Sequence, residues 1–203
     1  MLMSMWFFED DRVRIGRMVV GPLDNNVYVV AAPNGEAVII DAADEAGRVL
    51  DAVAGLTVTA VLTTHGHADH LQAAEAVTLR LGVPFRLHPA DQPLAGITDV
   101  VPIRDHEVID VGDGRLEAIH TPGHTPGSTC FRLGPHLFSG DTLFPGGPGA
   151  TRFPYSDFDQ IMESLETRLF TLPDATTVYP GHGAFTTIGE ERSSIPEWRA
   201  RRW

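Results

Sequence analysis

Thr63-Thr64-His65-Gly66-His67-Ala68-Asp69-His70 is the most informative stretch of the chain. Its last six residues carry four metal-capable side chains. Three are imidazoles, which suit zinc, iron and similar metals, and one is a carboxylate. Gly66 leaves room for the two flanking rings to reach one ion, whereas Asp69 and His70 can turn toward a second point. A histidine-rich solvated loop is the alternative interpretation, but clustered His and Asp favour a metal site.

Regular structure is predicted on both sides of this stretch. Residues 58–62 are apolar and partly β-branched, which is typical of a buried strand. Residues 71–81 show the apolar spacing of one helix face, and Asp69 is expected near the N-terminus of this helix, where an acidic residue is favoured. The metal-capable residues are therefore predicted on a loop at the carboxyl end of a strand. Open α/β sheets bind their ligands at that position.

Composition indicates an acidic globular protein. The chain has 203 residues, enough for one sizeable core, and a single domain is expected over residues 1–203. Hydrophobic residues make up 43% and charged residues 21%, which is ordinary for a globular domain. The formal net charge of -12 argues against a broad surface for nucleic acid. Every basic residue is Arg, so a lysine Schiff base and a P-loop lysine are excluded.

The only cysteine, Cys130, excludes an internal disulfide and fits a reducing compartment, so a cytoplasmic location is expected. The apolar segment Met1–Phe8 lacks a basic region and is too short to cross a membrane. It is interpreted as an edge strand or an interface segment, and no membrane association is expected. The oligomeric state is left open.

The rest of the chain alternates predicted strands with short helices. Residues 88–113 are expected to be rich in loops, and the Gly/Pro-rich residues 145–154 are expected to form a loop over the site. The two β-rich halves predict two packed sheets with helices outside. Strands are predicted at 27–31, 37–40, 85–87, 116–120, 129–133, 137–139 and 178–179, and helices at 45–54, 71–81, 157–170 and from 190 onward, with Asp157 as an N-cap.

Three more metal-capable residues, His124, Asp141 and His182, stand beside or near glycines at predicted strand ends. Glycine beside a ligand lets the backbone come close to an ion or a substrate. Each residue alone is more often an ordinary turn residue. Together with the four above they make seven candidates, five His and two Asp. Two four- or five-coordinate ions need about that many if one carboxylate bridges them.

In order and spacing these residues resemble the metallo-β-lactamase superfamily. Four phrases resemble its glyoxalase II (hydroxyacylglutathione hydrolase) branch in the single-domain bacterial form: Thr-His-Gly-His-Ala-Asp-His (64–70), His-Thr-Pro-Gly-His-Thr-Pro-Gly-Ser (120–128), Gly-Asp-Thr-Leu-Phe (140–144) and Tyr-Pro-Gly-His-Gly (179–183). The similarity runs from about residue 17 to about residue 192. It implies an α/β fold, specifically a four-layer αβ/βα sandwich.

The resemblance also implies a role for each candidate. Asp41 resembles a family carboxylate that orients a ligand histidine. The expected cofactors are two divalent ions, zinc first, with iron or manganese as alternatives. The roles implied for the ligands are His65, His67 and His124 on the first ion, Asp69, His70 and His182 on the second, and Asp141 as the bridge, with Asp69 and Asp141 as the catalytic carboxylates.

Chemistry leads to the same expectation. Two ions roughly 3.5–4 Å apart can share a water and lower its pKa toward neutrality. The resulting hydroxide can attack an acyl carbonyl while an ion stabilises the oxyanion, and a thiolate leaves without a strong acid. The expected activity is hydrolysis of an acyl-thiol small molecule, such as S-lactoylglutathione. Ser128 and Cys130 are interpreted as strand residues, because no partner that would activate them as nucleophiles is evident.

Some positions depart from the two-domain glyoxalase II pattern. The helical domain that helps those enzymes bind glutathione has no counterpart after His182 in this chain. Ala150 and Ala184 stand where the pattern has a basic residue and a tyrosine. Arg152 and Tyr155 lie close by in the sequence and are predicted to bind substrate instead.

Two other functions stay open at this point: a persulfide dioxygenase with a single iron, and a metal-binding protein without turnover. A β-lactamase is disfavoured, because those zinc enzymes usually lack a ligand like His70. None of the four remaining histidines is predicted to be a ligand. His120 is expected near the site, and the other three are expected at the surface: His88, His106 and His136.

Overall fold

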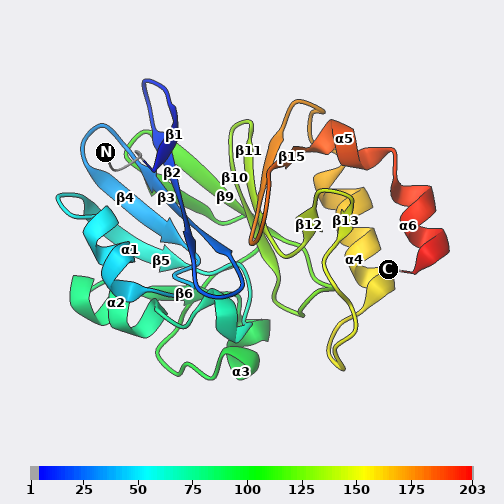
Figure 1. Ribbon diagram of the computed structural model, residues 1–203, viewed down its shortest axis with the longest axis horizontal. Coiled ribbons are helices and arrows are strands. Elements are labelled where there is room, and N and C mark those ends of the chain that lie inside the picture. The colour runs from blue at the N-terminus through cyan, green and yellow to red at the C-terminus, as the bar shows by residue number, and fades with distance from the viewer. Residues whose placement is uncertain (1–4, 203) are drawn as a thin grey trace.

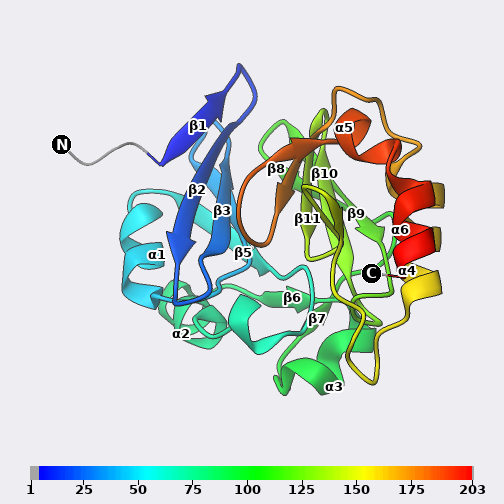
Figure 2. The ribbon, with the colours of Figure 1, turned by 45° about the vertical axis from the view of Figure 1, so that its right-hand side comes forward.

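The protein is a sandwich of two facing β-sheets with helices on both outer faces (Figures 1 and 2). The computed structural model describes residues 5–202, and residues 1–4 and 203 lie outside the described part. This arrangement confirms the predicted α/β class and the four-layer αβ/βα order. No helix within residues 5–202 combines the length and apolar character needed to cross a membrane.

The first sheet has seven strands that lie side by side in chain order. Its first four strands pair with one another in antiparallel fashion, and the fourth to the seventh pair in parallel. The apolar N-terminal segment contributes an edge strand, as predicted, although Met1–Ser4 fall outside the described residues. The strands are β1 (Trp6–Glu9), β2 (Arg14–Val20), β3 (Asn25–Ala31), β4 (Glu36–Ile40), β5 (Thr57–Leu62), β6 (Phe85–Leu87) and β7 (Val101–Pro102).

The second sheet has six strands in the order β15-β14-β11-β10-β9-β8. All neighbours are antiparallel except β11 and β14. A small separate hairpin, β12 (Leu143–Phe144) and β13 (Gly147–Pro148), overlaps the start of the predicted Gly/Pro-rich loop. The strands of the sheet are β8 (Val108–Val111), β9 (Gly114–His120), β10 (Thr129–Leu133), β11 (His136–Gly140), β14 (Thr177–Pro180) and β15 (Thr186–Thr187).

The helices are short and cap the two outer faces. The Asp157 carboxylate accepts a hydrogen bond from the Gln160 backbone N at 3.0 Å, which confirms the predicted N-cap. The helix expected from Leu71 begins at Ala74, so Asp69 lies in a separate 3-10 turn instead of the helix itself. The helical segments are α1 (Ala46–Ala52), η1 (Ala68–His70), α2 (Ala74–Leu81), η2 (Pro89–Asp91), α3 (Gln92–Ala95), α4 (Phe158–Ser164), η3 (Leu165–Leu169), α5 (Ile188–Arg192) and α6 (Ile195–Arg201).

Three apolar cores hold the layers together. Successive strand side chains point to opposite faces, so Val30 joins the core between the sheets while Val29 packs toward α1 and α2. In the second sheet, Phe138 faces the other sheet, whereas Leu137 packs in a cluster with Trp198 of α6. Burial on both faces explains why the central strands are almost continuously apolar.

The sequence expectation for His136 was wrong. His136 is buried instead of exposed, because Phe8 of β1 packs on its ring at a centroid distance of 4.2 Å and Tyr179 forms a 2.8 Å hydrogen bond to Nδ1. Residues 88–113 are rich in loops, as predicted, and they also contain the short elements η2, α3, β7 and β8. These elements are too short to show a clear period in the sequence.

Candidate metal centre

All seven candidate ligands meet at one edge of the sandwich. They lie on the loops that follow β5, β9, β11 and β14, so the carboxyl ends of four strands converge there. Among the described residues, three overlapping groups have ligand atoms within 4.8 Å of one another. These groups are His65, His67 and His124; His65, His70 and Asp141; and Asp69, His70 and His182.

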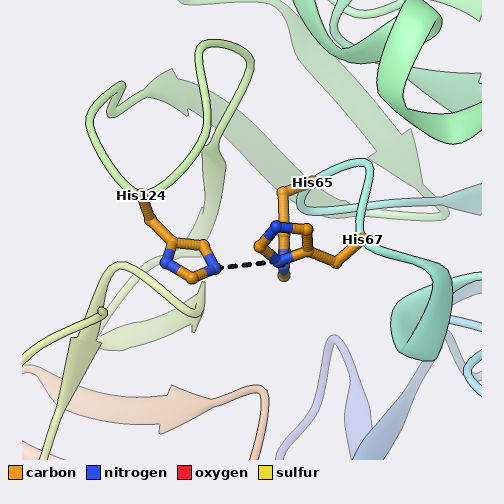
Figure 3. Close-up of side chains that lie close together, drawn as sticks. All are labelled: His65, His67 and His124. Carbon is orange, nitrogen blue, oxygen red and sulfur yellow. Dashed lines mark hydrogen bonds between the residues drawn. The ribbon is translucent and has the colours of Figure 1, made fainter. Parts of the chain in front are cut away.

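The first group brings three imidazole rings together (Figure 3). Nδ1 of His67 lies 3.0 Å from Nε2 of His65 and 3.0 Å from Nε2 of His124. Nitrogens bound to one tetrahedral zinc ion at about 2.0–2.1 Å lie roughly 3.3 Å apart. The three inward nitrogens are therefore spaced as ligands of a single ion.

Each ring of the first group has a partner on its outward nitrogen. Nδ1 of His124 donates to the Ala150 carbonyl at 2.7 Å, and Nε2 of His67 lies 2.8 Å from the Tyr155 hydroxyl. Nδ1 of His65 lies 3.1 Å from the Thr64 hydroxyl. An outer partner fixes the tautomer and the orientation of a ligand histidine, which leaves the inward nitrogen free for a cation.

The second group joins two histidines to Asp69. Nε2 of His182 lies 3.1 Å from Nε2 of His70 and 3.3 Å from Oδ2 of Asp69. His182 donates through Nδ1 to the Leu23 carbonyl at 2.9 Å, and His70 faces Asp41 Oδ2 through Nδ1 at 3.1 Å. Asp41 thus stands where the resemblance predicted an orienting carboxylate.

Asp141 lies between the two groups. Its Oδ1 is 3.4 Å from Nε2 of His70, and its Oδ2 is 3.7 Å from Nε2 of both His124 and His182. Oδ1 is buried and has no hydrogen-bond partner among the described residues. A buried carboxylate oxygen without a partner is costly, and a bound cation would remove that cost. The donor set and this oxygen fit a pair of metal ions.

The first group is held in its neutral form. Burial, followed by the nearby His70 and His124, holds the pKa of His65 well below its usual value. Burial and His124 lower the pKa of His67 to about 4, and burial lowers the pKa of His124. Neutral imidazole is the form that binds metal ions.

In the second group, the pKa values of the two histidines are raised. Burial alone would lower the pKa of His70, but the carboxylates of Asp141 and Asp41 together outweigh burial and raise that pKa well above its usual value. For His182, burial is likewise outweighed, here by the hydrogen bond to Asp69 together with the Asp141 carboxylate and the hydrogen bond to the Leu23 carbonyl, so its pKa is also raised. A cation that binds to this group has to displace protons.

Zinc uptake by the metal-free protein should therefore depend on pH mainly at the second group. His70 and His182 gain protons as the pH falls through their raised pKa values, so zinc affinity at that group should decrease toward lower pH. The first group should change little, because its lowered pKa values keep it neutral. Chelator competition at about pH 6 and about pH 8 checks this difference. The same pH dependence of both binding steps would contradict it.

The residues predicted to bind substrate lie beside the first group. Arg152 is exposed, stands over the Phe153 ring at 5.6 Å, and lines an open cavity of about 620 Å³ together with Phe158 and Arg202. The Tyr155 ring stacks on Phe153 at 5.5 Å while its hydroxyl faces His67. Their part in substrate binding stays a prediction.

The remaining sequence interpretations concern Cys130, Ser128 and the histidines His120 and His88. Burial raises the pKa of the Cys130 thiol to about 11, so the thiolate is scarce near neutral pH and the residue is unsuited to be a nucleophile. Ser128 lies in a hydrogen-bonded turn with Thr125, at 2.7 Å between the hydroxyl oxygens. His120 is half-buried and stacks on His88 at 4.0 Å, and neither is part of the ligand groups found among the described residues.

Sequence reasoning missed two polar residues near the site. Nδ2 of Asn25 donates to Oδ2 of Asp69 at 3.0 Å, and Asn26 holds the Pro180 carbonyl at 2.8 Å, just before His182. Both asparagines are buried at the start of an apolar strand. The signal in the sequence is a pair of asparagines directly before an apolar strand, because amide groups on a buried strand need hydrogen-bond partners. A third missed residue is the buried Asp91.

Comparison with known proteins agrees with this geometry. The family model of the metallo-β-lactamase superfamily matches residues 20–182. Hydroxyacylglutathione hydrolase GloC of Haemophilus influenzae is 34% identical over 199 residues, which cover 87% of this chain and 94% of GloC.

Two crystal structures are also similar. TTHA1623 in a di-iron-bound form is 36% identical, with a TM-score of 0.79, and the match covers 89% of this chain and 98% of that chain. ETHE1 from Myxococcus xanthus is 33% identical, with a TM-score of 0.80 and coverage of 90% and 83%. With the family model spanning both ligand groups, the chain belongs to the metallo-β-lactamase superfamily.

Proposed function

We propose that this protein is a dinuclear metal hydrolase that cleaves thioesters such as S-lactoylglutathione. The observation that carries the proposal is the position of Asp141, which faces both ligand groups with its two oxygens. The similarity to hydroxyacylglutathione hydrolase GloC supports a thioester of this class. The proposal rests on the three groups of metal-capable side chains and on membership of the metallo-β-lactamase superfamily.

The chain's own residues would prepare the centre for this reaction. When bound, the two ions supply an activated water and stabilise the charge of the oxyanion. Asn25 and Asp41 fix the orientation of Asp69 and His70 through hydrogen bonds of 3.0 and 3.1 Å. Asp69 and His182 are about one-quarter exposed, so substrate can approach from their side. A thiolate leaving group needs no strong acid, in agreement with a site whose imidazoles and carboxylates would serve as metal ligands.

We expect the protein to show little selectivity for the thiol part of its thioester substrate. Ala150 and Ala184 occupy the positions where the glyoxalase II pattern implies glutathione contacts, and the formal net charge of -12 repels an anion at long range. The open cavity beside the first group offers Arg152 and Arg202 for the charged end of a carrier. One arginine contact is worth roughly 1.5–3 kcal/mol, or roughly ten- to a hundredfold in affinity.

The test compares glutathione, coenzyme A and simple alkyl thioesters that share one acyl group. We expect kcat/KM values within about tenfold of one another, and Arg152→Ala should reduce only those for the charged carriers, by roughly tenfold or more. Arg115→Ala, on an exposed arginine in β9, is the matched control and should change none of them. A strong preference for the glutathione ester that is lost in Arg152→Ala would show instead that the chain has rebuilt a glutathione site.

A persulfide dioxygenase that uses one iron is the second candidate. The similarity to ETHE1 and to a protein in a di-iron-bound form favours it, since iron suits the same imidazole and carboxylate donors. Oxygen uptake by the iron-loaded protein with a low-molecular-weight persulfide, in the absence of thioester hydrolysis, would favour this candidate over the hydrolase.

A further inference from the structure

Asp91 is a fully buried carboxylate that lies outside the four loops carrying the candidate ligands. It lies on the turn η2, which follows the carboxyl end of β6 at the same edge of the first sheet. Its Oδ2 accepts hydrogen bonds from the Gly66 backbone N at 2.8 Å and from the Thr125 hydroxyl at 2.6 Å. Its Oδ1 accepts one from the Gly127 backbone N at 2.6 Å.

These three bonds join the two loops that carry the whole first group. Gly66 stands between His65 and His67, and Thr125 follows His124 directly. The loops come from different sheets, since one follows β5 and the other joins β9 to β10. One carboxylate therefore bridges two loops whose histidine nitrogens must match a single ion.

The glycines of both loops are shaped around this carboxylate. A Cβ on Gly66 would lie 2.8 Å from the Asp91 carbonyl oxygen, and a Cβ on Gly127 would lie 2.6 Å from Asp91 Cγ. Any other residue at either position would push the loop away from Asp91. The close approach thus needs glycine on both sides, independently of the hydrogen bonds.

A chain of hydroxyl groups extends the same arrangement. Because the Thr125 hydroxyl donates to Asp91, it accepts from the Ser128 hydroxyl at 2.7 Å, and Ser128 Oγ accepts from the Thr125 backbone N at 3.1 Å. The turn after His124 is therefore closed on itself and fixed to Asp91. The hydroxyl groups of Thr125 and Ser128 therefore stabilise the conformation of this turn.

Asp41 provides a useful contrast. Its carboxylate accepts from the Thr64 backbone N at 2.7 Å and from the Thr64 hydroxyl at 2.8 Å, and it faces Nδ1 of His70 in the second group. Asp91 has no hydrogen bond to a ligand histidine among the described residues, and it contacts backbone and hydroxyl donors of both first-group loops. We propose that Asp91 is a positioning residue for the first ion, and that it acts by holding the His65–His67 loop and the His124 loop in register.

The inference shares one premise with the proposed function, namely that the seven residues bind two ions. Asp91→Asn keeps the shape of the side chain but replaces one accepting oxygen with an NH₂ donor. That donor would face either Gly127 N or the pair formed by Gly66 N and Thr125, so at least one contact is lost. Loss of an outer partner of this kind commonly costs about ten- to a hundredfold in metal affinity.

The experiment measures zinc affinity one site at a time. Asp91→Asn is placed in a His182→Ala protein, which keeps the first group, and in a His124→Ala protein, which keeps the second. We expect zinc affinity by chelator competition to fall about tenfold or more in the first background and less than about threefold in the second. Equal losses in both backgrounds, or none in either, would overturn the proposal.

Two further variants separate positioning from general stability. Val77→Ala truncates a buried side chain of α2, so it should lower the thermal midpoint and leave both affinities unchanged. Thr125→Val removes one of the three contacts and should lower zinc affinity at the first group more than at the second. This variant keeps the proposal testable if Asp91→Asn does not fold. Zinc affinity is measured without substrate, so a failure to hydrolyse thioesters would leave the result intact.

Discussion

Asp141→Ala is expected to bind one ion instead of two and to lose nearly all hydrolytic activity. Asp141 faces His70 with one oxygen and His124 and His182 with the other, so its removal takes a donor from both groups. Removing a group that stabilises the transition state typically costs roughly a hundred- to a thousandfold in kcat, and loss of an ion adds to this. Elemental analysis and the thioester rate check the two parts of the expectation.

Asp110→Ala is the matched control for this variant. Asp110 is an exposed carboxylate in β8, at the far edge of the second sheet, and its loss should change neither the metal content nor the rate. If Asp141→Ala kept both ions, the bridging position assigned to Asp141 would be wrong.

Gly181→Ala should produce a similarly large loss through a single added methyl group. The Cβ would lie 2.3 Å from Oδ1 of Asp141 and 2.5 Å from Cε1 of His70, so both side chains would have to move. The backbone of Gly181 does not have the positive φ that disfavours alanine, so the effect should fall on the site and not on the turn. We expect the second ion to be lost together with a fall in kcat of roughly a hundredfold or more.

Gly47→Ala is the control for an added methyl group. Gly47 lies in α1 with no atom within 4 Å of a built Cβ, so alanine should raise the free energy of unfolding by about 0.5–1 kcal/mol and leave activity unchanged. Full metal content in Gly181→Ala would show that Asp141 and His70 are not held as close to Gly181 as the structure has them.

The fold could be predicted from the sequence because its signals are local. Apolar runs separated by Gly/Pro turns gave the central strands, and the stretch around His65 and Asp69 indicated a site at a strand end. The structure brings that stretch together with His124, Asp141 and His182, which were selected from their place beside or near glycines at strand ends.

The missed features depend on contacts that are distant in the sequence. Asp91 lies 25 residues from Gly66 and 36 residues from Gly127, and the short turn that carries it shows no period. The Gly-Pro turn before His136 predicts an exposed side chain, but the folded chain brings β1 over it. Local patterns therefore locate donors for an ion, whereas the carboxylate that spaces their loops needs the tertiary structure.

Zinc titration of the metal-free protein, with thioester hydrolysis as the readout, tests the central proposal most directly. Seven donors shared through Asp141 predict that the rate rises until about two equivalents of zinc are bound and then stays constant. A maximal rate at one equivalent would contradict the two-ion site. Absence of hydrolysis at two equivalents, with glutathione, coenzyme A and alkyl thioesters alike, would contradict the proposed reaction.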